Sequence, residues 1–530
     1  YYGIKTAEDL RKFAEAVNSS RSYDRYRDES GDVVLLGDID MTGTTEWTPI
    51  GTAENPFTGK FDGKGYTIRN INWTADAAKS TAHGLFGVLN QATVRNLTVG
   101  VKGDKHTIRG TAGAGTAIAG IAAFATESLL ESVTNNVSIS FEAEDPAGVL
   151  VMLAGIVGQM TGTTIGGTSA AVKCANNGDI TTGPIANTAN GATGMQVGGI
   201  CGLTKGDIVC SDNFGEIIAR CDIFTMAGGI AGSTHSALTV GDCVNYAAVT
   251  ASGFAGGSVG GIVGQAARPI VAVQCLNKAA VKFAGESPKV RTAVGGIIGN
   301  AFAKGDAKWA VAVVECRNEG DVSCGYAANT YNSARGIHVG GLCGFIAGNE
   351  TVNAVVRFSS NTGAVHSESG RIGGIMALAS FCDVQECVNE GTVDGSAAVA
   401  GGISGLFEAG DMYGCVNVGD VLLKGSGNAG GIVGTTQTPK RYTAITDCRN
   451  GGVICGRFGF TASILAESRN DTDRVDGCGV GGAVGTPAQG REAPRVTAEN
   501  YGMFILGRNT ERNNAEVGEV RPCYYWNGTK

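Results

Sequence analysis

Residues 401–429 read GGISGLFEAGDMYGCVNVGDVLLKGSGNA, and both halves of this stretch recur along most of the chain. The first phrase, Gly-Gly-aliphatic-x-Gly, begins at positions 198, 228, 260, 295, 340, 401 and 430. The second, Cys-x-Asn-x-Gly-x-Val with small variations, begins at positions 174, 243, 275, 316, 387 and 415. A phrase that returns with a period of roughly 20 to 50 residues indicates a solenoid, in which each repeat packs on its neighbours.

The spacing inside the phrases predicts strands. Cys415, Asn417 and Val421 lie an even number of residues apart, so an extended chain places them on one face. The branched residue of the first phrase, such as Ile403, should stack on its copies in a buried aliphatic ladder. We expect three short strands in this unit, near GISGLF, MYGCVN and DVLLKG.

We therefore predict an all-β fold: a single right-handed parallel β-helix (β-solenoid) with an N-terminal helical cap. The predicted divisions are a cap over residues 1–32, the solenoid over 33–500 and a closing segment over 501–530. The cap contains TAEDLRKFAEAVN (residues 6–18), where Thr6 fits the N-cap position and Leu10 and Phe13 share one helical face.

The cysteines follow the repeat. Eight of the 16 are assigned to one slot of successive units, Cys210 among them, and Phe358 in the same slot suggests that it requires an apolar side chain. Stacked thiols about 4.8 Å apart have parallel Cβ vectors, which fit the disulfide torsion poorly. We therefore predict buried free thiols at Cys243, Cys275, Cys316, Cys387 and Cys415.

Asparagine recurs beside this slot, at Asn176, Asn213, Asn245, Asn277, Asn318, Asn361, Asn389, Asn417 and Asn450. Its spacing joins it to the buried face. We expect these amides to hydrogen-bond along the solenoid instead of forming an exposed binding stripe.

Charge and composition exclude several functions. The net charge is -8 with no block of like charge, so we expect no nucleic-acid partner. No apolar run approaches the roughly 18 residues of a membrane span. The opening YYGIKTAEDL is not a signal peptide, and we expect that a signal segment has been removed.

The repeat GGIVG followed by CxNxGxV resembles the GLUG motif of bacterial surface proteins. The opening, with VVLLGDIDM, WTPIG and HGLFG, resembles the start of secreted, often lipid-anchored proteins of gut Bacteroidetes, and CYYWNG (523–528) is similar to their closing segment. The resemblance implies the solenoid architecture and an adhesin. The motif also accompanies peptidase domains, but the metalloprotease sequence HExxH is absent here.

Catalytic and metal-binding patterns are weak. Asp38, Asp40 and Asp62 could supply the paired carboxylates of a polysaccharide hydrolase or lyase, but an Asp beside a turn glycine is explained by turn chemistry. Asp471, Asp473 and Asp476 resemble a calcium loop whose spacing is off by one residue. The five histidines share no slot, so surface positions are expected for them.

Aromatic residues in the longest units favour binding. Trp309, Tyr326, Tyr331, Arg335 and His338 lie where adjacent units lengthen, and such side chains stack on sugars or anchor proteins.

The expected function is a non-catalytic, adhesin-like binding protein, without a cofactor and as a monomer. Its partner would be a host glycan, a surface protein or a polysaccharide. It would lie outside the cell or on the outer-membrane surface, touching the membrane only through a removed lipid anchor. A polysaccharide hydrolase or lyase and a structural stalk remain alternatives.

Overall fold

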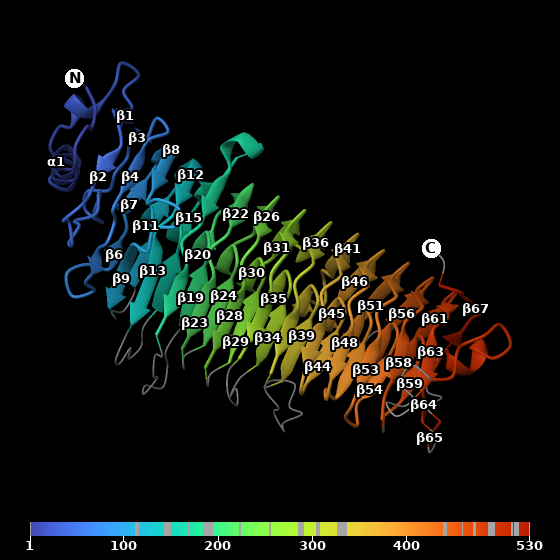
Figure 1. Cartoon of the computed structure of the whole chain (residues 1–530). Helices are drawn as coiled ribbons and strands as arrows, with labels where there is room; N and C mark the ends of the chain where they lie inside the picture. The colour runs from blue at the N-terminus through green and yellow to red at the C-terminus, as the bar shows by residue number, and fades with distance from the viewer. Residues whose placement is uncertain are drawn as a thin grey trace. The chain divides into compact units, whose positions relative to one another are not determined.

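The structure is a computed structural model. It describes residues 2–528 except 112–115, 143–149, 168, 184–193, 222–223, 254–255, 285–290, 304–307, 326–335, 438–442, 458, 470–472, 486–492, 510–511 and 514–518. Two compact units are present, Tyr1–Ala255 with Ile262–Gly264, and Gly256–Gly261 with Gln265–Lys530. In each unit, strands of successive coils lie side by side and pair in parallel (Figure 1). The predicted parallel β-helix is confirmed.

A regular coil of the second unit contains five strands. They are β49 (Val399–Gly401), β50 (Ser404–Glu408), β51 (Gly410–Tyr413), β52 (Val416–Asn417) and β53 (Val421–Leu423). The prediction of three strands is therefore wrong, because two of the three segments are divided: Gly402 and Ile403 separate β49 from β50, and Gly414 and Cys415 separate β51 from β52. Each strand pairs with the next coil, for example Ser404 with Val433 in β55 (Val433–Thr436).

The aliphatic ladder at this corner is confirmed. Ile403 donates its backbone N–H to the carbonyl of Ile432 at 3.0 Å, and its own carbonyl accepts from Ile375 at 3.1 Å. Burying one such side chain contributes about 1.5–3 kcal/mol. All members of the ladder are fully buried: Ile200, Ile230, Ile262, Ile297, Leu342, Ile403 and Ile432.

A second ladder consists of the repeated asparagines, as predicted. In the second unit Nδ2 of Asn389 donates to Oδ1 of Asn417 at 2.8 Å, and Asn417 donates in turn to Asn450 at 2.8 Å. Each amide also donates to the carbonyl two residues further on, at 2.9 Å for Asn389. The first unit has its own ladder, which begins at Asn135, a residue that the repeat pattern does not reveal.

The second glycine of the first phrase packs directly on this amide. A Cβ on Gly402 would lie 2.3 Å from Cγ of Asn417 and 2.1 Å from the carbonyl oxygen of Gly431. Gly374 meets Asn389 in the same way, with Cγ at 2.3 Å. The second glycine of the first phrase leaves space for the asparagine amide of the second phrase, and the two phrases therefore occur together.

The predicted buried free thiols are confirmed, since all 16 cysteines are buried and free. Their slot requires a small donor that reaches the carbonyl two residues earlier, through Sγ of Cys243 at 3.2 Å and Oγ of Ser359 at 2.8 Å. The assignment of Phe358 and Cys210 to this slot is wrong. Both lie one residue before it with positive φ, and Ser359 and Ser211 fill it.

The predicted helix is α1 (Ala7–Asn18), and it opens with a capping box in which Thr6 and Asp9 bond at 3.1 Å. Phe13 on its buried face makes edge contacts with the rings of Tyr23, Tyr26 and Phe57, at centroid distances of 5.4–5.8 Å. No helix in the described part of the chain is long and apolar enough to cross a membrane.

The contact between the Gly-Gly corner and the amide generates a prediction. Gly402→Ala should lower the free energy of unfolding by about 1–3 kcal/mol, because the new Cβ displaces either the Asn417 amide or the neighbouring backbone. Gly325→Ala is the control, since a Cβ there meets nothing within 4 Å. Thermal unfolding measured by calorimetry checks both, and equal midpoints for the two variants would contradict the packing described.

Candidate functional site

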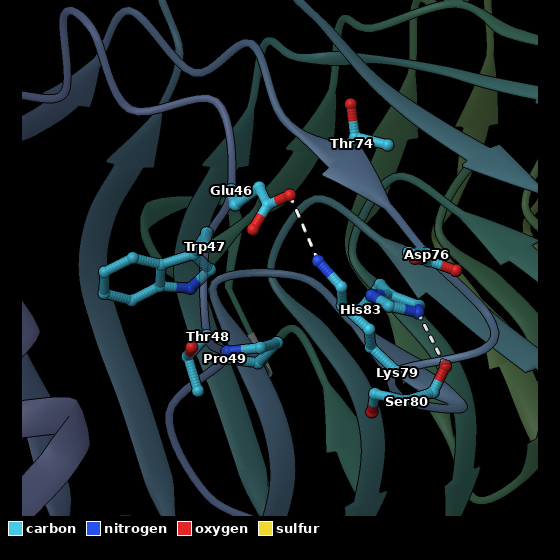
Figure 2. A pocket seen from close by; sticks show the side chains of 9 residues that line it. All are labelled: Glu46, Trp47, Thr48, Pro49, Thr74, Asp76, Lys79, Ser80 and His83. Carbon is cyan, nitrogen blue, oxygen red and sulfur yellow. Dashed lines mark hydrogen bonds and ion pairs between the residues drawn. The ribbon is translucent and has the colours of Figure 1, made fainter.

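A pocket of about 200 Å³ lies in the first unit (Figure 2). It differs from the close-packed regular coils because polar and aromatic side chains surround open space. Its lining residues are Glu46, Trp47, Thr48, Pro49, Thr74, Asp76, Lys79, Ser80 and His83.

Two chain segments form the pocket. One lies between β2 (Ile39–Asp40) and β3 (Lys60–Asp62), and the other runs from β5 (Thr74–Ala75) to β6 (Ala82–His83). They are joined by the backbone N–H of Thr74, which donates to the carbonyl of Thr45 at 2.9 Å. This bond keeps the two walls at a fixed separation.

The second segment is shaped by a tight turn. Oδ1 of Asp76 accepts the backbone N–H of Ala78 at 2.9 Å, and the carbonyl of Asp76 accepts that of Lys79 at 3.0 Å. Oγ of Ser80 then accepts the N–H of Ala82 at 3.0 Å. Such side-chain bonds favour a turn over a continued strand, and they direct Lys79 toward Glu46.

Lys79 and Glu46 form an ion pair at the pocket, with Nζ and Oε1 3.1 Å apart (Figure 2). Both side chains are mostly exposed, so the pair contributes only about 0–1 kcal/mol. Either group can therefore exchange its partner for a ligand at little cost.

Trp47 supplies a fixed aromatic wall. Its Nε1 donates to the carbonyl of Leu85 at 3.1 Å, and its ring stacks on Trp73 with centroids 5.3 Å apart and planes 18° from parallel. Trp73 is buried. The Trp47 ring is thus held before any ligand arrives, which lowers the entropy that binding must overcome.

His83 is the buried polar group of the pocket. Its Nε2 lies 2.8 Å from the carbonyl oxygen of Ser80, which can only accept, so Nε2 carries the proton and Nδ1 is the acceptor. Burial lowers the pKa of His83, although the nearby Asp76 carboxylate opposes this shift. The imidazole is therefore neutral at pH 7.

Only two of the five residues predicted from sequence to bind a partner lie in the described part of the chain. Tyr326, Tyr331 and Arg335 lie outside the described residues, whereas Trp309 is 72% exposed. His338 lies in β39 (Ile337–Gly340) and is completely buried. The expectation of surface histidines is thus wrong for His338 and for His83.

His338 belongs to a buried charged cluster in the second unit. Strand register places it beside Arg371 in β44 (Arg371–Gly373), and its ring lies 6.2 Å from that of Phe345. The Arg291 guanidinium lies 4.3 Å from the Phe345 ring centre. Burial, with Arg371 and Arg291 adding to it, holds the pKa of His338 well below its ordinary value. Burial also raises the pKa of Glu408, against the opposing effect of Ser380 and both arginines.

The acidic residues considered for catalysis serve turns and ion pairs. Asp40 accepts bonds from Thr42 and Asn70, at 2.6 and 2.7 Å, which lower its pKa to about 2. Asp38 accepts the N–H of Thr67 at 3.0 Å, and Asp62 pairs with Arg95 at 3.0 Å.

The acidic residues considered for calcium are also engaged. Asp471 lies outside the described residues. Asp473 is buried and accepts bonds from Thr436, from Oγ of Ser468 at 2.8 Å and from the N–H of Thr443 at 3.2 Å. Asp476 pairs with Arg521 at 3.5 Å. Among the described residues, no three or more potential ligands converge on a metal position.

Comparison with known proteins adds little. No protein-family model and no curated protein matches the chain. It is similar to a solved structure of a "putative immunoglobulin A1 protease" from Bacteroides ovatus, with 14% identity over 80% of this chain and 77% of that chain, and a TM-score of 0.23. Identity and TM-score this low say nothing about activity.

Sequence reasoning missed the pocket because its residues are distant in the chain and follow no period. The available signals were WTPIG and HGLFG, which place Trp47 and His83 in the irregular region before the regular repeats. Neither segment indicates by itself that the two residues line one cavity.

The buried His338 generates a pH prediction. Its folded pKa lies below the unfolded value of about 6.5, so above that pH the proton has no effect on folding. Below about pH 6.5 the His338 imidazole becomes protonated in the unfolded chain but stays neutral in the folded chain. The free energy of unfolding therefore falls by up to about 1.4 kcal/mol for each unit of decreasing pH. The thermal midpoint should therefore fall between pH 7.5 and 5 less steeply in His338→Leu than in the parent.

His106→Gln is the control, because this histidine is partly exposed. It should reproduce the parent's pH dependence. Equal slopes for His338→Leu and the parent would contradict the burial of a neutral imidazole.

Proposed function

We propose that this chain is a non-catalytic, adhesin-like binding protein that holds a saccharide of a host glycan or polysaccharide in the pocket. One observation carries the proposal: an aromatic wall fixed before binding, Trp47, stands beside exposed polar groups that can form hydrogen bonds, Glu46 and Lys79. Aromatic faces pack on the C–H faces of sugars, while charged side chains bond their hydroxyls.

The chemistry of the lining favours an uncharged polyhydroxylated ligand. Glu46 and Asp76 offer carboxylate oxygens, Lys79 offers donors and His83 offers one acceptor nitrogen. Acceptors and donors are mixed, so no strong field of one sign selects an ion. A volume of about 200 Å³ suits one sugar unit instead of a long segment.

The resemblance of the repeats to GLUG surface proteins supports a location outside the cell or on the outer-membrane surface. The solenoid would act as a stalk that carries the pocket, so a structural role is compatible with this proposal.

A hydrolase or lyase is the rival function. Two carboxylates, Glu46 and Asp76, line the pocket, and paired carboxylates perform glycoside cleavage. However, Asp76 accepts a backbone N–H of its own turn, and Glu46 is mostly exposed beside Lys79. Neither carboxylate is buried, whereas the general acid of a glycosidase is usually shielded from water.

A glycan array followed by calorimetry on the best ligand tests the proposal. Trp47→Ala and Lys79→Met should each weaken binding at least about tenfold, or about 1.4 kcal/mol. Lys79 is mostly exposed, so its replacement should not disturb folding even where that of Trp47 does. Trp309→Ala, an exposed tryptophan of the second unit, should bind as the parent does.

Two results would overturn the proposal. Loss of binding in Trp309→Ala with unchanged binding in both pocket variants would move the site to the Trp309 surface. Release of shorter oligosaccharides by the purified parent, abolished in Glu46→Gln, would establish the enzyme.

A further inference from the structure

The closing segment adds a rung to the second unit. Strand β67 (Tyr524–Tyr525) pairs in parallel with β62 (Gly479–Val480), and β66 (Glu519–Val520) pairs with β61 (Arg474–Asp476). The N–H of Tyr524 donates to the carbonyl of Cys478 at 3.0 Å. Cys478 precedes β62 and Cys523 precedes β67, so this register places the two cysteines side by side.

The two thiols are in hydrogen-bonding contact. Paired strands lie about 4.8 Å apart, within the Cα separation of roughly 4.4–6.8 Å that disulfides span. Each Sγ also contacts a carbonyl two residues earlier, at 3.4 Å for Cys478 and 3.5 Å for Cys523. These contacts are weak and can be given up when a covalent bond forms.

This pair differs from the interior thiols because its outer strand has one partner among the described residues. Strand β57 (Arg449–Asn450), which follows Cys448, pairs with a strand on each side, β52 and β62. Among the described residues, β67 pairs with β62 alone. Rotating the parallel Cβ vectors into disulfide geometry would therefore disturb two paired strands beside β57 but one paired strand beside β67.

Reactivity points to the same cysteine. The hydrogen bond from the Cys478 thiol lowers the pKa of Cys523, against the opposing effect of burial. Burial raises the pKa of Cys415, an interior member of the same column, well above its ordinary value. The thiolate is the attacking species in disulfide exchange, so this hydrogen bond favours Cys523 over Cys478 as the attacking thiol.

We propose that Cys478 and Cys523 are an oxidation site, at which a disulfide fastens the closing segment to the preceding coil. The oxidant would be a small-molecule or protein disulfide. The Cys523 thiolate attacks one of its sulfurs and displaces a thiolate, giving a mixed disulfide. The Cys478 thiol then loses its proton and attacks Sγ of Cys523, releasing the second thiol. Two protein thiols are oxidised, and one external disulfide is reduced to two thiols.

The bond would fasten a strand that has one paired neighbour among the described residues. A strand paired on one side opens more easily than one paired on both. A covalent link holds that rung in place without altering the interior. The inference does not depend on the pocket or on the proposed saccharide.

Peptide mapping of the full chain tests the site. The folded protein is incubated with excess oxidised glutathione, alkylated in denaturant without reduction, and digested with trypsin. Cys478 and Cys523 lie in separate peptides, 475–491 and 513–530, each with one cysteine. Most of the protein should yield these two peptides joined, with the loss of two hydrogens. Cys243, Cys275, Cys316, Cys387 and Cys415 should remain alkylated.

Matched variants and a second readout complete the test. Cys523→Ser should abolish the joined peptide, and Cys448→Ser, one rung inward, should retain it. Proteolytic release of the closing segment should be at least about tenfold slower in the oxidised parent than in oxidised Cys523→Ser. Full alkylation of Cys523 after oxidation, or a link from Cys478 to Cys448, would overturn the proposal.

Discussion

Each unit depends on one constraint: the buried asparagine amide must find partners inside a solenoid that excludes water. Nδ2 of Asn417 has two hydrogens, one for the carbonyl of Gly419 in its own coil and one for Oδ1 of Asn450 in the next. A buried amide left without these bonds would cost about 1–3 kcal/mol. Each amide therefore finds an equivalent acceptor when the next coil repeats it, and Gly402 must lack a side chain to admit it. The sequence repeat is a consequence of this condition.

The asparagine ladder of the first unit begins at Asn135, and that of the second unit ends at Asn450. Asn450 is in register with Val480, which has no amide, so its Nδ2 bonds instead to Oγ of Ser463 at 3.1 Å. Asn135 is likewise in register with Val99 on its N-terminal side. Coils before Asn135 are free of the repeat, and the pocket lies among them. The described pocket therefore lies where the ladder is absent.

Periodicity predicted the residues that face the main core but not those beside the Gly-Gly corner. Alternation in β39 places Val339 inside and predicts His338 outside, yet the whole strand is buried. The corner folds the following strand back, so Phe345 covers the face on which His338 lies. Alternation assumes one solvated face, and that assumption fails wherever two strands of one coil pack on each other. The pocket was beyond prediction for another reason, since Trp47 and His83 approach only through the turn that Asp76 and Ser80 stabilise.

The cysteine slot shows how chemistry refines a sequence pattern. Burial alone would admit valine or alanine, yet serine replaces cysteine at Ser211 and Ser359. Both residue types donate to the carbonyl two residues earlier, as Ser211 does at 3.1 Å. The residue before the slot has a positive φ, 46° at Cys210 and 51° at Phe358, which bends the strand at that point. The carbonyl two residues before the slot also accepts a backbone N–H from the preceding coil, as that of Gly241 does from Cys210 at 3.0 Å, and the small side chain adds a second bond to the same oxygen. The cysteines thus act as weak hydrogen-bond donors in a buried bend, and the proposed disulfide would replace that donor at Cys523, whose strand has one neighbour among the described residues.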